Sequence, residues 1–364
     1  MGANAVRAAV LHEYGKPLDI EEIDLEPTGP GQVRVRIAAS GICHSDLSVI
    51  QGKFPFPVPC VLGHEGAGVV TEIGDGVQRV QPGDHVILNW NPGCGTCPLC
   101  QRGEIHLCES AATWTFNSPY ASVRGTPLFR GLGTATFADE TLTVERAVVP
   151  IDADIPLDIA ALVGCAITTG VGAVLNTAAV PAGSTVAVVG CGGVGLSVVM
   201  GAKLAGAERI VAVDLSAERR AIARSLGATD EVDGGGDAMQ AVLDLTAGLG
   251  VDYAFEVVGV PVTMQLAWRI TRRGGTTVAV GAGSAEEETS FRMFDLFFQS
   301  RSLVGCVYGS AAPDRDFPRF LGMWKQGELP IDALVTERIA LEQINDAFDA
   351  MQAGEGARSV IINP

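Results

Sequence analysis

Apolar and polar positions follow different patterns in different parts of the chain. In the second half, short apolar runs alternate with stretches of helical spacing. The strand-like runs lie within 184–206, 209–228, 251–259, 276–282 and 302–308. Such alternation of strand and helix is typical of a parallel sheet with helices on both faces. We therefore predict a doubly wound α/β domain over residues 167–308.

The first 160 residues show no such alternation. Residues 32–40 alternate apolar and polar positions as a half-buried strand does, and glycine or proline interrupts the chain every few residues. This pattern predicts a compact, β-rich domain. The C-terminal stretch has a helix-like segment, 340–354, and a strand-like segment, 358–364. We expect it to return to the first domain, which then comprises 1–166 and 309–364.

Composition narrows the possible partners. The 364 residues are 47% hydrophobic and 18% charged, as in folded globular proteins, and carry a net charge of -17. This charge disfavours binding to nucleic acid or to anionic membranes, so small molecules are the expected partners. The N-terminus lacks the pattern of a secretory signal, and we expect no apolar stretch of membrane-spanning length. These features predict a cytoplasmic protein.

Four of the nine cysteines lie within fifteen residues, in the loop CGTCPLCQRGEIHLC. In a reducing compartment, such a cluster is more often a metal site than a disulfide framework. Four thiolates on a turn-rich loop favour tetrahedral Zn²⁺ with no open position, which is a structural site. The alternatives are a redox pair or cysteines without a ligand role. The predicted zinc ligands in this lobe, 91–109, are Cys94, Cys97, Cys100 and Cys108.

Three further residues from separate segments suggest a second metal. Cys43 lies in GICHSDLSVIQG, His64 in a glycine-rich turn, and Cys165 in ALVGCAITTG. Two thiolates and one imidazole match a catalytic zinc that keeps a fourth position for water or substrate. We interpret the remaining scattered cysteines as small buried side chains.

A glycine motif in the second half predicts a dinucleotide site. An apolar run ends in Gly190, Gly192, Gly193 and Gly195, and a helix-like stretch follows. These glycines allow a tight turn, close approach of the backbone to a pyrophosphate, and packing of helix on strand. The next strand ends in Asp214, which can bind both adenosine ribose hydroxyls and would repel a 2′-phosphate. NAD is therefore favoured over NADP.

Along essentially its whole length the chain resembles the zinc-dependent medium-chain alcohol dehydrogenases. GHEGAGVVTEIGDGV follows the zinc signature of that family, and the four-cysteine lobe and the glycine motif occur in the family's order. The resemblance implies a GroES-like catalytic domain joined to a Rossmann coenzyme domain, with two zinc ions per chain. The residues that it implies for the catalytic site are Cys43, His44, Ser45, Asp46, His64, Glu65 and Cys165. Those that it implies for NAD are His44, Thr169, Gly190, Gly192, Gly193, Val194, Gly195, Asp214, Arg219 and Arg358.

The chemistry expected of such a site is alcohol oxidation. Zinc favours loss of the proton from a bound alcohol, and hydride then leaves for the nicotinamide. By the resemblance, Asp46 orients His64, and Ser45 begins the proton relay. Many relatives have histidine at the position of Ser48, so we hypothesise that the proton leaves through water or His44. Since His44 stands where several relatives have arginine, we also expect weaker binding of NADH.

The resemblance places Phe54, Trp90 and Phe137 on the walls of the substrate pocket. Broad apolar walls favour primary alcohols with aromatic or allylic groups. The alternatives are a nicotinoprotein that retains its NAD, and a glutathione-linked formaldehyde dehydrogenase. A zinc-free reductase and a non-enzymatic zinc-binding protein fit the motifs less well. We also expect a homodimer or homotetramer.

Overall fold

The structure is a computed structural model that describes residues 5–111, 118–354, 356 and 358–364. The chain divides into two compact units. The first contains Met1–Cys165, Ala312–Gly322 and Val335–Pro364, and the second contains Ala166–Ala311 and Met323–Leu334. The domain bounds predicted from the sequence placed residues 166, 309–311 and 323–334 in the first domain, whereas these residues group with the second unit by their contacts.

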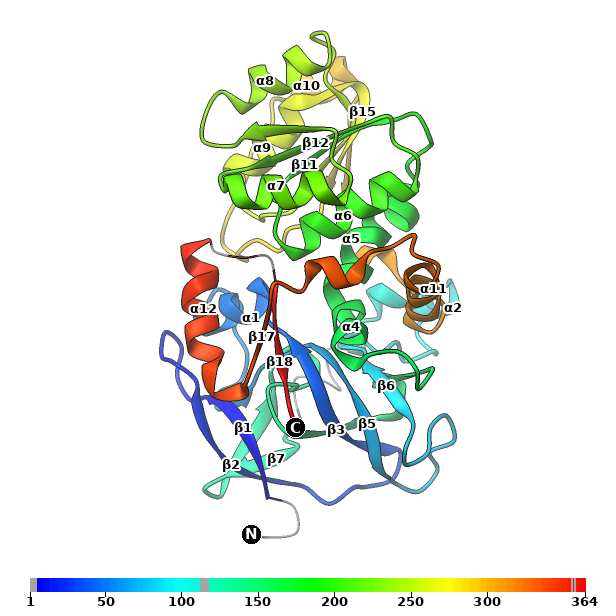
Figure 1. Cartoon of the computed structure of the whole chain (residues 1–364), viewed down its shortest axis with the longest axis vertical. Coiled ribbons are helices and arrows are strands. Elements are labelled where there is room, and N and C mark those ends of the chain that lie inside the picture. The colour runs from blue at the N-terminus through cyan, green and yellow to red at the C-terminus, as the bar shows by residue number, and fades with distance from the viewer. Residues whose placement is uncertain (1–4, 112–117, 355, 357) are drawn as a thin grey trace. The chain divides into compact units, whose positions relative to one another are not determined.

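The first unit contains a small closed barrel and a larger sheet (Figure 1). The barrel strands, in spatial order, are β1 (Ala5–Leu11), β2 (Asp19–Leu25), β7 (Ala121–Val123), β8 (Thr126–Arg130) and β4 (Cys60–Val61). Buried side chains of β1 and β4 pack in its core, together with Phe137. Closure leaves these strands with paired neighbours on both sides, which limits aggregation through exposed edges.

The larger sheet carries the segments that later form the metal site. Its order is β10 (Val148–Ile151), β6 (His85–Leu88), β5 (Glu65–Ile73), β3 (Gln32–Gly41), β18 (Ser359–Ile362) and β17 (Glu337–Ile339), and β9 (Glu140–Val144) also pairs with β3. The alternation predicted for 32–40 is present in β3, where Val33, Val35 and Ile37 are buried. Because β18 pairs antiparallel with β3, the C-terminal residues belong to the sheet of the first unit.

Short helices lie between these strands. They are α1 (His44–Ile50), α2 (Pro98–Gln101), α4 (Leu157–Leu162) and α12 (Ile344–Ala353), and α11 (Pro313–Lys325) crosses the bounds of the two units. Helix α12 and the 3₁₀ turn before it, Leu341–Gln343, correspond to the helix-like segment 340–354. Ile344, Ala347 and Phe348 form its buried face, at the spacing of an amphipathic helix.

The second unit is built on a six-stranded parallel sheet. Its order is β13 (Asp230–Asp233), β12 (Arg209–Asp214), β11 (Thr185–Val189), β14 (Val251–Glu256), β15 (Thr271–Ala279) and β16 (Ser302–Gly305). Its helices are α5 (Thr168–Gly172), α6 (Gly193–Leu204), α7 (Ala217–Leu226), α8 (Ala238–Leu245), α9 (Pro261–Ile270) and α10 (Met293–Gln299). Strand order reverses beside β11, and right-handed crossovers then put helices on both faces. This confirms the predicted doubly wound sheet.

Two features differ from the sequence pattern. Helix α10 was not predicted, because its apolar residues, in MFDLFFQ, surround most of the helix and show no amphipathic spacing. The expectation that no apolar stretch reaches membrane-spanning length was wrong. Residues Leu157–Thr177 form a 21-residue apolar helical run with wider π turns at Val163–Ile167 and Ala173–Thr177. Its most apolar window is 89% buried inside the structure, as in the core helix of a soluble protein.

Candidate active site

Four side chains with metal-binding atoms meet in the first unit. Cys43, His64, Glu65 and Cys165 each offer one ligand atom, and these atoms all lie within 4.8 Å of one another. All four side chains are buried. Cys43 immediately precedes α1, the His64–Glu65 pair lies at the start of β5, and Cys165 lies in the π turn after α4. The fold therefore gathers the three residues that the sequence predicted as ligands of a catalytic zinc, with Glu65 beside them.

Asp46 sets the orientation of the His64 ring. Its side chain is fully buried, and both carboxylate oxygens lie 3.2 Å from Nδ1 of His64. The backbone N–H of Gly63 donates to Oδ1 of Asp46 across 2.9 Å, and this holds the carboxylate in place. Because Nδ1 donates to Asp46, Nε2 is the nitrogen left for a metal ion. Asp46 thus has the position expected of a carboxylate that supports a zinc-bound histidine.

The thiols of Cys43 and Cys165 have pKa values shifted in opposite directions, so Cys43 ionises before Cys165. A hydrogen bond from the Cys165 thiol holds the pKa of Cys43 well below its usual value, and the same contact raises the pKa of Cys165. Burial alone would lower the pKa of His64, but Asp46 and Cys43 outweigh it and raise that pKa. A divalent cation among these groups would stabilise both thiolates and a neutral imidazole together. The donor set therefore fits zinc.

A buried ion pair lies beside the cluster. Nη2 of Arg358 is 2.9 Å from Oε1 of Glu65, and Nη1 of Arg358 donates to the carbonyl of Ile42 across 2.6 Å. Burial raises the pKa of Glu65 to about 7, although Arg358 acts in the opposite direction. Sequence reasoning missed this pair, because the resemblance linked Arg358 only to the pyrophosphate of NAD. No local pattern could have revealed it, since the two residues come from segments far apart in the sequence.

The four-cysteine lobe forms a second cluster in the first unit. The four sulfurs lie within 4.8 Å of one another, and the Cys94–Cys100 and Cys97–Cys108 separations are both 3.9 Å. A tetrahedral zinc with Zn–S bonds of about 2.3 Å puts its sulfurs about 3.8 Å apart. Backbone N–H groups also point at sulfur, as from Cys97 to Cys94 across 3.1 Å. This geometry fits a closed structural zinc site.

The charges of the lobe also suit a cation. Hydrogen bonds from the hydroxyl and the backbone N–H of Thr96 lower the pKa of Cys94 to about 5. Burial raises the pKa of Cys100 to about 12. The four sulfurs would therefore not all ionise by themselves, whereas a bound Zn²⁺ stabilises every thiolate.

The glycine motif occupies the turn between β11 and α6 in the second unit. Gly190 has φ = 97°, in the left-handed region that favours glycine. A Cβ atom on Gly195 would stand 1.8 Å from the carbonyl oxygen of Gly190, so the close approach of helix and strand requires glycine there. A Cβ atom on Gly192 would meet nothing within 4 Å, so the backbone at Gly192 is open to a ligand. Gly193 and Val194 begin α6, whose amino terminus faces this turn.

Asp214, the last residue of β12, lies next to that turn. Its Oδ2 accepts the backbone N–H of Cys191 across 2.7 Å, and its Oδ1 accepts that of Ser216 across 2.8 Å. These bonds fix the carboxylate at the carboxyl edge of the sheet, where ligands of doubly wound folds bind. Ser216 caps α7, and Gly227 ends it, as the sequence suggests. Arg219 lies in the first turn of α7, and Thr169 is buried in α5.

The residues predicted around the substrate have different surroundings. Trp90 is half-buried, and its ring lies edge-on to His64, with centroids 6.5 Å apart and planes at 88°. Phe54 packs partly buried against the barrel core. Phe137 has no exposed surface and contacts Phe348 edge-to-face across 6.1 Å inside that core. A role of Phe137 on the pocket wall stays a prediction.

The proposed proton relay lies along α1. Oγ of Ser45 is 3.8 Å from Sγ of Cys43, which places the hydroxyl beside a predicted zinc ligand. His44 is exposed at the start of α1, and Ser48 is half-buried one turn later. The route of the proton beyond Ser45 stays a hypothesis.

Comparison with known proteins identifies the family. Residues 29–153 match the alcohol dehydrogenase GroES-like domain, and residues 193–326 match the zinc-binding dehydrogenase family. The chain belongs to the zinc-binding medium-chain alcohol dehydrogenases. Its first unit therefore contains the GroES-like barrel of this family and its second the Rossmann-type sheet, as the resemblance implied. The family membership and the two clusters together confirm the expected structural and catalytic zinc sites.

Individual relatives cover nearly the whole chain. Alcohol dehydrogenase class-3 of Drosophila melanogaster is 40% identical over 370 residues, which are 98% of this chain and 97% of that protein. S-(hydroxymethyl)glutathione dehydrogenase of Paracoccus denitrificans is 38% identical over 372 residues, with 98% and 99% coverage. The crystal structure of benzyl alcohol dehydrogenase from Acinetobacter calcoaceticus matches with a TM-score of 0.92 at 31% identity, covering 99% of each chain.

Proposed function

We propose that this protein oxidises primary alcohols to aldehydes with NAD. The observation that carries the proposal is the buried cluster of Cys43, His64 and Cys165, with Asp46 behind the histidine. Zinc bound there would supply the positive charge that favours an alkoxide over an alcohol, and NAD would accept the hydride. The fold keeps bulk water away from this cluster, because Cys43, His64 and Cys165 are all buried.

Proton removal is assigned to the residues of α1. Ser45 would accept the hydrogen bond of the substrate hydroxyl, because its Oγ lies next to Cys43. Its own proton would then pass to water or to the adjacent His44, which is exposed. Because position 48 is serine and not histidine, no imidazole at that position takes part in the route.

NAD is the expected coenzyme. The fixed carboxylate of Asp214 can accept hydrogen bonds from the two ribose hydroxyls, and it would repel the 2′-phosphate of NADP. A nicotinoprotein retains its NAD, whereas other dehydrogenases release it into solution. The absorbance of the purified protein distinguishes the two cases. We expect no absorbance from retained coenzyme after gel filtration.

For the substrate we propose S-(hydroxymethyl)glutathione as the first candidate. Two relatives at 38–40% identity, an alcohol dehydrogenase class-3 and an S-(hydroxymethyl)glutathione dehydrogenase, support this over our first expectation of aromatic alcohols. Aromatic alcohols are the second candidate. They are supported by the ring of Trp90 beside His64 and by the benzyl alcohol dehydrogenase of similar fold.

One kinetic comparison tests both candidates. The zinc-loaded protein is assayed with S-(hydroxymethyl)glutathione, benzyl alcohol and cinnamyl alcohol, each with NAD and with NADP. We expect kcat/KM to be highest for the glutathione adduct with NAD. A higher value for benzyl alcohol would reverse the order of the two candidates. Activity that survives complete removal of zinc would contradict the proposed chemistry.

We also propose that the protein forms a homo-oligomer. Helix α10 exposes Met293, Phe294 and Phe297, with 78%, 66% and 80% of their surface accessible. A contiguous apolar face of this kind is typical of an interaction surface. Helix α10 lies close in sequence to β16, which is an edge strand of the six-stranded sheet. Sedimentation of wild type and Phe297→Asp tests this: we expect an oligomer for the first and smaller species for the second.

A further inference from the structure

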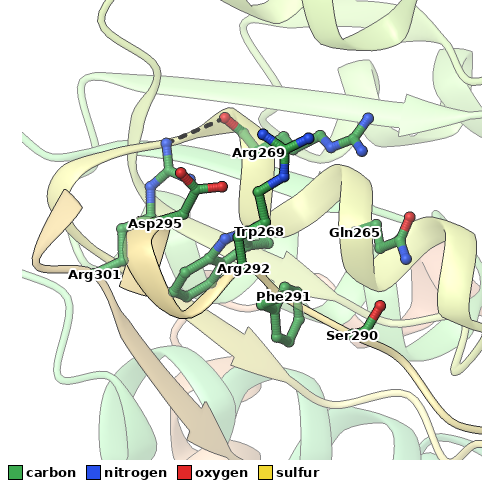
Figure 2. Close-up of a pocket in the computed structure, with 8 residues that line it drawn as sticks. All are labelled: Gln265, Trp268, Arg269, Ser290, Phe291, Arg292, Asp295 and Arg301. Atoms are coloured by element: carbon green, nitrogen blue, oxygen red, sulfur yellow. Dashed lines mark hydrogen bonds between the residues drawn. The ribbon is translucent and has the colours of Figure 1, made fainter. Parts of the chain in front are cut away.

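A cavity of about 480 Å³ opens in the second unit (Figure 2). It lies between the last turns of α9 and the segment that runs through α10 to β16. The lining residues that matter here are Trp268, Arg269, Phe291, Arg292, Asp295 and Arg301. Its volume is within the range of about 300–1,000 Å³ that is usual for small-molecule sites.

Positive charge dominates this cavity. Among the residues that the structure describes at this cavity, Arg269, Arg292 and Arg301 are basic and Asp295 alone is acidic. Within the described residues, none of the three arginines forms an ion pair. The whole chain has only 25 basic residues against 42 acidic ones, so three guanidinium groups around one cavity run against the overall charge, although the carboxylate of Asp295 acts on Arg301. Such a concentration of one charge focuses the field on a ligand of opposite charge.

Arg301 is held at the wall of the cavity by several contacts. Its Cζ lies 5.4 Å from the centroid of the Trp268 ring, and that ring lies 4.8 Å from the ring of Phe291. Nη2 of Arg301 donates a long hydrogen bond of 3.5 Å to the carbonyl of Arg269, drawn as a dashed line in Figure 2. Nε of Arg301 is buried without a hydrogen-bond partner. Burial lowers the pKa of this guanidinium, although the nearby carboxylate of Asp295 acts in the opposite direction. An anion in the cavity would offset the cost of burying this donor.

The other two arginines are exposed at the cavity and free to turn towards a ligand. Both side chains are accessible to solvent, and Figure 2 shows them extending to the same side of the view. Arg292 and Asp295 are three residues apart, so they share one side of this helical segment. Phe294 and Phe297 lie on the other side, which separates the cavity from the apolar face described above.

The cavity is distinct from the coenzyme site. Arg269 lies just before the start of β15, at Thr271, and Arg301 immediately precedes β16. Both therefore lie at the amino ends of parallel strands. The glycine turn and Asp214 lie at the carboxyl ends of β11 and β12 in the same sheet. Because parallel strands share one direction, the cavity lies at the amino ends of the strands and the coenzyme site lies at their carboxyl ends.

We propose that this cavity binds a small phosphorylated metabolite, with the phosphate between Arg269, Arg292 and Arg301. The planar fork of arginine matches phosphate oxygens in pairs, and three such forks can surround one phosphate group. The half-buried ring of Phe291 offers an apolar wall to the organic part. The site is additional to alcohol oxidation, and it needs neither the zinc ligands nor the glycine motif.

Calorimetric titration tests the proposal on zinc-loaded protein saturated with NAD, so that the coenzyme site is filled. The probes are inorganic phosphate, fructose 1,6-bisphosphate and, as a dicarboxylate, succinate. We expect saturable binding of the bisphosphate at one site per chain and weaker binding of inorganic phosphate. Arg269→Gln and Arg292→Gln should each weaken binding about tenfold or more, because each removes a charge-assisted hydrogen bond.

Two further variants make the test specific. Asp295→Asn should tighten phosphate binding, because it removes a negative charge from the cavity wall. If Asp295 had only a structural role, the substitution would not increase affinity. Arg273→Gln is the matched control. This arginine lies over the ring of Phe298, with Cζ 4.7 Å from its centroid, and does not line the cavity. We expect it to leave affinity unchanged. Arg269 and Arg292 are exposed, so their substitution should not impair folding.

Four results would overturn the proposal. The first is the absence of saturable heat with the bisphosphate. The second is an equal loss of affinity in Arg273→Gln and Arg292→Gln, which would indicate general attraction by surface charge. The third is equal affinity for succinate, which would exclude specificity for phosphate. The fourth is a change of oligomeric state in the arginine variants without any ligand binding, which would assign these residues to an interface between copies.

Discussion

Gly41 and Glu65 face each other across β3 and β5, and they lie so close that no side chain fits between them. A Cβ atom on residue 41 would stand 2.3 Å from Oε2 of Glu65. Glu65 in turn pairs with Arg358, so the absence of a side chain at position 41 leaves room for the buried ion pair beside the metal cluster.

Gly41→Ala should therefore displace Glu65. We expect a loss of about 1–3 kcal/mol in the free energy of unfolding, since overpacking at a buried site costs this much. The loss of alcohol oxidation should be larger than the loss of folded protein. Gly322→Ala is the control, because a Cβ atom there meets nothing within 4 Å and alanine favours the helix α11. Equal stability of the two variants in urea unfolding would contradict the role of Gly41.

The support of His64 by Asp46 predicts an effect on metal affinity. Asp46→Asn keeps the shape of the side chain but removes the negative charge that fixes the imidazole. We expect zinc affinity at the catalytic site to fall by about 10- to 100-fold, as for other residues behind a metal ligand. Competition with a chromogenic chelator measures this, with exposed Asp75→Asn as the control. An unchanged affinity would show that packing alone orients His64.

The four-cysteine lobe predicts a defined loss of metal. Cys100→Ala removes one of four sulfurs that lie within 4.8 Å of one another. We expect the zinc content to fall from two ions to one per chain, together with a lower melting temperature, because a structural zinc contributes folding energy. Elemental analysis after gel filtration measures the content. Cys306→Ala, outside both clusters, should keep both ions. Two ions in Cys100→Ala would contradict the assignment.

Asp252 predicts a pH dependence of stability in the second unit. Burial alone would raise its pKa, but hydrogen bonds from the backbone N–H and hydroxyl of Thr185, and the guanidinium of Arg272, outweigh it and lower the pKa. A carboxylate with a lowered pKa stabilises the folded state above its unfolded pKa of about 3.9, and the effect is lost as the pH falls below that value. Asp252→Asn should therefore be less stable than wild type at pH 6.

Denaturant unfolding at several pH values tests this. The difference in stability between Asp252→Asn and wild type should shrink as the pH falls through about 4 and below. Asp244→Asn, on the exposed side of α8, is the control and should show a small difference throughout. A difference that stays constant across this pH range would mean that the charge of Asp252 contributes nothing.

Much of the site could be predicted where its residues are close in sequence. The four cysteines of the zinc lobe lie within fifteen positions, so a single loop can bring their sulfurs together. The glycine turn and its helix are also local, because the positive φ of Gly190 and the approach of Gly195 depend on a few neighbouring residues. The doubly wound sheet followed from the alternation of apolar runs, since that pattern already reports burial on both faces.

By itself, then, the sequence determined the local chemistry: the zinc lobe, the glycine turn, Asp214 and the family signature around His64. Tertiary structure alone decided which distant residues meet. It joined Glu65 to Arg358, set Trp90 against His64 and enclosed Phe137 in the barrel core. It also brought Arg269, Arg292 and Arg301 around one cavity. The reason is physical: short-range spacing fixes turns and loop ligands, whereas contacts between remote segments depend on how strands pair and pack.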